Sequence, residues 1–561
     1  MDNPTRITYD VTPYYPGDKD GLVKGDRLLV VHGAAYRETA TAIPGEFYDE
    51  VFSGGKLHSY VTRDLPVNNI PAGSVGIMSV TLAHPGTHVY HSAFLPDVVR
   101  GAYYEFNVTG DSDDITTSPP ITTTNNVTVL PDVPPSAYAS VDDTTPVQHH
   151  QFKFDIRPVM QQLPFSIDGP TQVWSYSFNG QTPGPFLCVN EGDHVTITLT
   201  NTSNAVGEFE YSAFDIAKLR AIGTKNWDPE TVRANSSGIG NLGMMFRNAN
   251  LPLGGAQSLS TNIGDSKTIT FIADRPGVWM YNAMVVDPDN GAVDFSDTMY
   301  ATLSGLSGAM MVNPRGGRRA FGHPIQTVDK MFVLGEQEFY VPHTTNPDLK
   351  RVWDSTYTDI DALKDDTLAL MLAGPPTHLC FNAHVPRYNP ERKKNEVRRG
   401  FFTAGVEDTL QFEHGDNIAM INLVASRFSS PHLIGGHADL CWLGGSFSNH
   451  PVLDQESWYT CNGTATFATY TVSQPGQYVI VNHNLNEAFL LGAFGAAFSD
   501  TGLTYVTSTD SYILEPDKKN WDLSLMARVD HYLTIADGTQ VRPSPNENTR
   551  DLPGFIKTWS V

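Results

Sequence analysis

At 561 residues the chain is too long for one hydrophobic core, because single cores stop growing at about 250–300 residues. Its 37 basic and 61 acidic residues give a formal charge of −24, which argues against nucleic acid and anionic membranes as partners. An apolar content of 40% excludes wholesale disorder, and 4 cysteines without CxxC spacing argue against a disulfide scaffold and a structural zinc site.

An internal repeat organises the chain. Three segments open with Gly-Asp and continue as an apolar, β-rich run, and each is followed by Pro-Gly and an aromatic-rich strand. Pro-Gly predicts a tight turn, and the alternation behind it predicts a half-buried strand. We therefore expect an all-β chain with three copies of one β-sandwich. The Gly-Asp pairs begin at Gly25, Gly192 and Gly415, and the Pro-Gly pairs at Pro85, Pro276 and Pro475.

The copies imply boundaries along the chain. Residues 1–112, 151–316 and 328–512 are the expected sandwiches, and residues 113–150 are a linker rich in Thr, Ser and Pro. One helix is expected over residues 358–372, where Asp caps precede apolar residues spaced near 3.6. Residues 513–561 form a tail whose expected docking residues are Trp521, Leu523, Leu525 and Met526.

The N-terminal residues show neither a basic region nor an apolar stretch, so no signal peptide is expected. No run of about 18 apolar residues predicts a membrane helix, and no membrane insertion is expected. The sequence predicts no particular cellular compartment.

From about residue 150 to 510 the chain resembles the copper-containing nitrite reductases, which are trimers of two-cupredoxin subunits. The first copy resembles the second domain of that family. The resemblance therefore implies three cupredoxin-like Greek-key β-sandwiches. The matching stretches include FNGQTPGPFLCVNEGDHV (178–195), LSGLSGAMMVNPRGG (303–317), DKMFVLGEQEFYVP (329–342), PTHLCFN (376–382), SSPHLIGGHADLCW (429–442) and QPGQYVIVNHNLNEAFLLGAF (474–494).

The resemblance also implies two coppers. A blue copper takes a thiolate, two imidazoles and a weak thioether, and the catalytic copper takes three imidazoles, one of them from a neighbouring subunit. Where the family reads Tyr-His-Cys, this chain reads Tyr281-Asn282-Ala283, and the family's downstream His and Met fall on Ala301 and Leu306. The upstream stretch that carries two more ligands corresponds to residues 207–215, which hold no histidine.

In the third copy, His437 matches the remaining ligand of the catalytic copper, and Asn422 stands where an imidazole lies above that copper. We therefore expect no catalytic, cofactor-binding or metal-binding residue of the family, and no bound copper. The vestigial family positions are Asn282, Ala283, Ala301, Leu306, Asn422 and His437.

Other histidines and cysteines leave alternatives open. His32 and His91 would form a relocated metal site only if the fold brings them together, whereas His88 and His91 point to opposite faces of one strand. The pair at residues 149–150 is expected to be exposed at the end of the linker. Residues 441 and 461 are either a disulfide across strands or two thiols.

We therefore expect a non-catalytic structural or assembly protein that associates with itself as a homotrimer or a larger assembly, such as a shell, surface layer, filament or complex. One alternative is a copper-dependent nitrite reductase or oxidase with residual or relocated copper. Another is a cupredoxin-like module that binds a small ligand or a protein. An apolar pocket where Ala283, Ala301 and Leu306 meet would favour this last alternative.

Overall fold

The structure is a computed structural model of the chain. The described residues are 21–57, 61–111, 123–124, 145–163, 171–180, 182–204, 238–246, 261–287, 292–315, 328–341, 360–373, 376–381, 410–412, 414–473, 476–484, 487, 494–499, 503–508, 511–516, 533–534 and 540–541.

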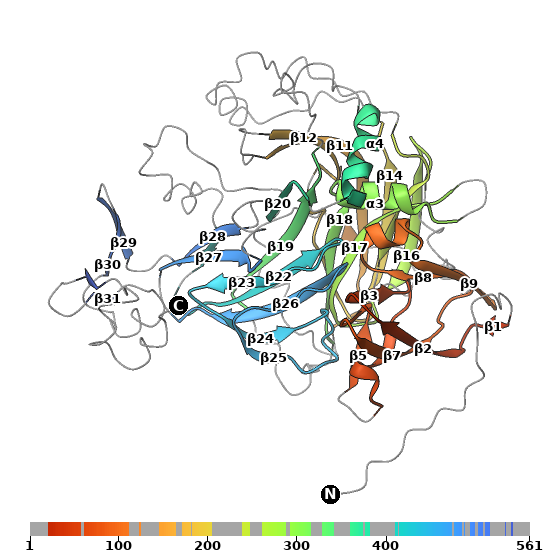
Figure 1. The fold of residues 1–561 in the computed structure, drawn as a ribbon, viewed down its shortest axis with the longest axis horizontal. Helices are drawn as coiled ribbons and strands as arrows, with labels where there is room; N and C mark the ends of the chain where they lie inside the picture. Colours follow the sequence, from red (N-terminus) through yellow and green to blue (C-terminus); the bar gives the residue numbers. More distant parts are fainter. Residues whose placement is uncertain are drawn as a thin grey trace, which may run out of the picture.

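The chain is all-β and contains cupredoxin-like sandwiches, the first of which is red to orange in Figure 1. Its two sheets have the strand orders β1-β9-β8-β3-β6 and β2-β7-β4-β5. Its strands are β1 (Leu22–Val23), β2 (Arg27–Ala34), β3 (Thr39–Ala42), β4 (Tyr48–Phe52), β5 (Val61–Leu65), β6 (Val67–Ile70), β7 (Ser74–Thr81), β8 (Gly86–Ser92) and β9 (Tyr103–Thr109).

The second sandwich has sheets of order β10-β11-β14-β16, with β12 also paired to β11, and β13-β18-β17-β15. Its strands are β10 (Thr123–Thr124), β11 (His149–Leu163), β12 (Thr171–Phe178), β13 (Leu187–Asn190), β14 (His194–Asn201), β15 (Leu242–Phe246), β16 (Ser266–Ile272), β17 (Gly277–Val285) and β18 (Ser307–Asn313).

The third sandwich has sheets of order β20-β19-β22-β26-β24-β25 and β21-β28-β27-β23. Its strands are β19 (Lys330–Phe339), β20 (His378–Phe381), β21 (Leu410–Phe412), β22 (Asn417–Val424), β23 (Pro431–Ile434), β24 (Ala438–Trp442), β25 (Val452–Gln455), β26 (Thr464–Thr471), β27 (Gly476–Asn482) and β28 (Phe494–Ser499). Two further pairs are β29 (Leu503–Ser508) with β30 (Ser511–Pro516), and β31 (Leu533–Thr534) with β32 (Gln540–Val541).

Short helices join the strands. They are the 3₁₀ turn η1 (Ser53–Gly55) and the α-helices α1 (Leu95–Val99), α3 (Phe295–Leu303) and α4 (Ile360–Ala373). The helix expected over residues 358–372 is confirmed as α4. The proposed docking residues of the tail, at 521–526, lie outside the described residues, as does the stretch 207–215. No helix within the described part of the chain is long and apolar enough to span a membrane.

The Gly-Asp repeat marks the same turn before β2, β14 and β22. Gly25, Gly192 and Gly415 all have a positive φ, between 85° and 94°, which favours glycine over any residue with a Cβ. Behind two of them the Asp carboxylate closes the turn: Asp26 accepts from the Val23 amide at 2.9 Å, and Asp193 accepts from the Asn190 amide at 2.9 Å. The predicted strands after Gly-Asp and after Pro-Gly are confirmed.

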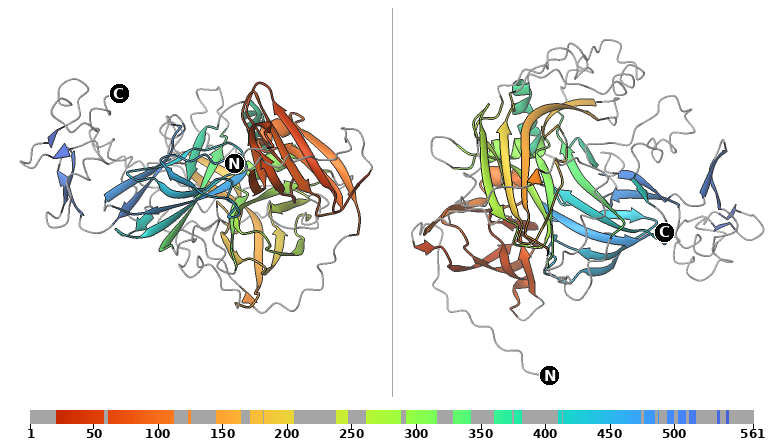
Figure 2. Two further views of the ribbon diagram at one scale, coloured as in Figure 1. Left: turned by 90° about the horizontal axis from the view of Figure 1, so that it is seen from below. Right: turned by 180° about the vertical axis from the view of Figure 1, so that it is seen from behind.

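One continuous core runs through the second and third sandwiches and takes in Phe47 and Leu95 of the first. The first sandwich therefore lies against the other two, as both views in Figure 2 show. Arg63 of its strand β5 exchanges two hydrogen bonds with Asn449 of the third sandwich, each 2.8 Å long. Asp64 pairs with Arg275 of the second sandwich at 2.8 Å.

Candidate functional site

The structure brings together the four family positions of the second sandwich. Asn282 and Ala283 lie on β17, Ala301 lies on α3, and Leu306 follows that helix. The Ala283 amide donates to the Leu306 carbonyl at 2.9 Å, and the Leu306 amide donates to the Ala301 carbonyl at 3.3 Å. All four side chains are fully buried.

Local sequence explains this packing. Every residue of β17 is buried, so that both faces of the strand contact protein. Helix α3 begins at the N-cap Asp294, whose carboxylate accepts from the Asp297 amide at 3.0 Å. Ala283, Ala301 and Leu306 belong to the main hydrophobic core, so the space between them is filled by methyl and methylene groups. None of these three residues lines the small apolar cavity that the structure shows between the first and second sandwiches.

Asn282 is the polar member of the group. Its Nδ2 donates to the Ala283 carbonyl at 2.9 Å and to Thr302 Oγ1 at 3.3 Å, while its Oδ1 is buried without a hydrogen-bond partner. In the third sandwich, Asn422 Oδ1 accepts from Trp458 Nε1 at 3.0 Å. Both amides are thus held inside the protein as hydrogen-bonding groups.

These residues do not fit the copper that the resemblance implies. Copper in such sites takes imidazole, thiolate and thioether ligands, and the side chains present are methyl, isobutyl and amide groups. A single orphaned amide oxygen on Asn282 is too weak and too isolated a donor to hold the ion.

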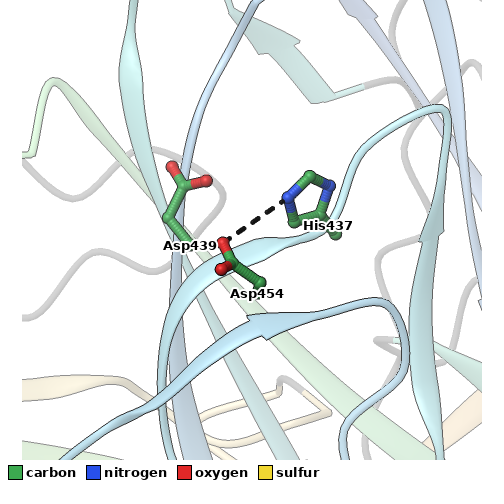
Figure 3. Close-up of side chains that lie close together, drawn as sticks. All are labelled: His437, Asp439 and Asp454. Atoms are coloured by element: carbon green, nitrogen blue, oxygen red, sulfur yellow. Dashed lines mark ion pairs between the residues drawn. The ribbon is translucent and has the colours of Figure 1, made fainter.

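His437 lies elsewhere, beside the hairpin that β24 and β25 form in the third sandwich. Figure 3 shows its ring pointing toward two carboxylates, those of Asp439 on β24 and Asp454 on β25. His437 Nε2 lies 3.9 Å from Asp454 Oδ1, and one donor atom from each residue lies within 4.8 Å of the others. The side chains of His437 and Asp454 are 50% and 79% exposed, so solvent reaches the group directly.

Among the described residues, this is the one group of three or more whose donor atoms meet closely enough to hold a metal. Sequence reasoning singled out His437 but missed both aspartates. The spacing of His437 and Asp439 places them on one face of an extended segment, which is a readable signal. Asp454 was not readable, because its place opposite Asp439 depends on the register of the hairpin.

The alternative of a relocated metal site at His32 and His91 gains no support, because the two rings have different partners. The Tyr90 hydroxyl lies 2.7 Å from His32 Nδ1, whereas His91 Nδ1 lies 2.5 Å from the Ser92 carbonyl. His91 instead lines a small apolar cavity between the first and second sandwiches. The other residues that line it are Pro44, Val89, Leu95, Met245, Met284, Val293, Phe295 and Thr298.

The expectation of exposed linker histidines is wrong for His150. This side chain is buried, and its Nε2 lies 2.9 Å from the carboxylate of Asp193, which itself is fully buried. Arg315 Nη2 lies 3.1 Å from the other Asp193 oxygen. The reason is the parallel pairing of β11 with β14, which extends strand structure to the end of the linker.

Cys441 and Cys461 are thiols that do not form a disulfide in the structure, so the second of the two interpretations holds. Cys441 is fully buried, and burial raises the pKa of its thiol well above the usual range. A neutral, buried thiol is a poor nucleophile, and Cys441 therefore acts as a core residue.

A buried network of carboxylates occupies the third sandwich. Glu336 and Glu338 share one face of β19, and Glu487 lies nearby; all three are buried. Arg427 pairs with Glu487 at 2.7 Å and donates its amide to Glu338 at 2.8 Å, and Ser429 donates to Glu336 at 2.6 Å. Burial, and then the charges of the other two glutamates, raise the pKa of Glu336 to about 8. The raised pKa of Glu336 favours its protonated form at neutral pH.

The paired sheets and the internal core of each sandwich define a multidomain cupredoxin-like protein. No protein-family model matches the chain. It is 33% identical over 332 residues to the copper-containing nitrite reductase of Rhizobium meliloti, which covers 59% of this chain and 71% of that protein. The chain belongs to the family of copper-containing nitrite reductases.

Further relatives follow the same pattern. The copper-containing nitrite reductase of Alcaligenes faecalis is 33% identical over 335 residues, which is 60% of this chain and 72% of that protein. Among solved structures, the copper nitrite reductase from Nitrosomonas europaea is 20% identical, with a TM-score of 0.40, covering 63% of this chain and 94% of that chain.

Proposed function

We propose that the chain is a non-catalytic structural or assembly protein, built on a nitrite-reductase scaffold whose copper ligands have been lost. In this proposal it associates with itself, as a homotrimer or as a unit of a larger assembly. The observation that carries the proposal is the packing of Ala283, Ala301 and Leu306 in the core, at positions where the resemblance places copper ligands.

An unused metal site destabilises a folded protein. A buried imidazole or thiolate without its metal would lose hydrogen bonds to water and gain none in return. Small or neutral replacements such as Ala283 avoid that cost and keep the sheets packed. Residues of this kind are typical of a scaffold retained for its shape.

The test uses the full chain, purified without chelators and then incubated with copper. We expect no absorption band near about 600 nm of the kind a blue copper produces, no nitrite reduction, and a homotrimer or larger particles in light scattering and electron micrographs. Nitrite reduction together with such a band would overturn the proposal and favour the copper enzyme. A monodisperse single chain without particles would overturn the assembly role and favour a binding module.

A further inference from the structure

We propose that His437, Asp439 and Asp454 form a binding site for a divalent transition-metal ion with the ligand preferences of Zn²⁺, on the outer hairpin of the third sandwich. The site goes beyond the scaffold function proposed above. It also differs from a family copper site, because two of its three donors are carboxylates.

The two carboxylates of the site come from opposite strands of the hairpin. In the hairpin, Ala438 pairs with Gln455 and Leu440 pairs with Leu453, so that Asp439 and Asp454 face each other across the two strands. Like charges directly opposite on an antiparallel pair are destabilising. A dication between them would convert this repulsion into two attractive contacts.

The three donors are one imidazole nitrogen and two carboxylate oxygens. His437 adds one imidazole nitrogen on the same side of the hairpin, and all three donors lie within 4.8 Å of one another. Zinc binds imidazole nitrogen and carboxylate oxygen at about 2.0–2.2 Å, often with three protein ligands and a water. Donors on exposed side chains close the remaining distance by small rotations about their χ angles.

A backbone hydrogen bond already orients the Asp439 carboxylate. Asp439 Oδ2 accepts the backbone amide of Thr471 on the adjacent strand β26, at 2.7 Å. Hydrogen bonds of this kind hold a ligating carboxylate in place and increase the affinity of the site for metal. That hydrogen bond leaves the second oxygen of Asp439 for a metal, and two carboxylates balance the charge of a dication.

The experiment is a calorimetric titration of the full chain with Zn²⁺, and in parallel with Mg²⁺. We expect one Zn²⁺ per chain and much weaker binding of Mg²⁺, which prefers oxygen ligands. Asp454→Asn and His437→Gln should each weaken Zn²⁺ binding by about tenfold or more. His450→Gln, at an exposed histidine in the loop before β25, is the matched control and should bind as the wild type does.

A second measurement separates metal binding from folding. Zn²⁺ should raise the Tm of the wild type but not that of Asp454→Asn, because a ligand that binds the folded state stabilises it. Without metal, Asp454→Asn should melt at or above the wild-type temperature, since it removes the repulsion from Asp439. Zn²⁺ affinity that is equal in the wild type and both variants, or no binding at about 100 μM, would overturn the site.

The two proposals fail independently. Loss of Zn²⁺ binding in the hairpin variants bears only on this site, whereas nitrite reduction and a blue-copper band bear only on the scaffold function. Copper bound in the wild type but not in Asp454→Asn, without turnover, would support the hairpin site and leave the scaffold function standing.

Discussion

The Phe47 ring of the first sandwich packs edge-on against the Trp279 ring of the second, with 5.1 Å between their centroids. The Arg275 guanidinium covers the same phenyl ring at 4.3 Å from its centroid. Since Arg275 also pairs with Asp64, one arginine joins an aromatic contact and an ion pair across the boundary. This cluster fixes the first sandwich against the rest of the chain.

Phe47→Ala should therefore detach the first sandwich. Loss of a buried phenyl group in a well-packed site costs about 3–5 kcal/mol. We expect calorimetry to show a separate melting transition of this sandwich at a lower temperature. We also expect proteases to cleave the variant faster than the wild type. Tyr36→Ala is the control, because Tyr36 is 95% exposed. A single transition at the wild-type temperature would contradict the role of the cluster.

Ala283→Leu tests whether the former copper region is filled. Ala283 is fully buried among core residues, and added methylenes in a packed core cost about 1–3 kcal/mol. We expect a lower free energy of unfolding in urea, whereas Ala102→Leu, at an exposed position, should change little. An unchanged free energy for Ala283→Leu would reveal spare volume and favour the ligand-binding alternative.

The stability of the chain should fall as the pH rises toward 8. The pKa of Glu336 is about 8 in the folded protein because the group is buried, well above the ordinary value of 4.5. Between these two values the folded state binds a proton that the unfolded state has lost, so stability decreases as the pH rises from about 4.5 through 8. Burial raises the pKa of Glu46 in the first sandwich to about 8 as well, which adds to the effect.

The measurement is the Tm of the full chain between about pH 6 and pH 9. Glu336→Gln should make the decrease in Tm up to about pH 8 less steep without abolishing it, since Glu46 still titrates. Glu456→Gln, at an exposed glutamate, should leave the slope as it is. The same slope in Glu336→Gln as in the wild type would show that Glu336 does not carry the excess proton.

Asp193→Asn should destabilise the second sandwich. Burial acts to raise the pKa of Asp193, but hydrogen bonds from His150, Gln148 and Asn190 outweigh it and lower the pKa below its usual range. The charged form is thus the stabilising one, and its contribution is lost as the pH falls below about 4. Removing one partner of a buried charge pair costs about 3–5 kcal/mol.

Urea unfolding at neutral pH measures this loss. Asp365→Asn, at an exposed position on α4, is the control and should unfold like the wild type. In acid the difference between wild type and Asp193→Asn should shrink, because the wild-type carboxylate is then protonated. A constant difference across that range would mean that the charge of Asp193 is not what stabilises the sandwich.

Repeats and turn chemistry made much of this fold predictable. Glycine at a positive φ and a carboxylate that closes the turn recur before β2 and β14, and both are local features of a few residues. The candidate metal site was only partly predictable. His437 and Asp439 are close in sequence on one extended segment, so that their shared face is a local feature. Asp454 depends on how β25 pairs with β24.

Short-range chemistry thus accounts for the all-β class, the strands that follow Gly-Asp and Pro-Gly, and helix α4, because turns and side-chain alternation depend on adjacent residues. Long-range pairing accounts for the rest. It buries His150 against Asp193, gives His32 and His91 different partners, packs the core around Ala283, and sets Asp454 opposite Asp439. Such contacts depend on register and on packing between sheets, which residues far apart in the chain establish together.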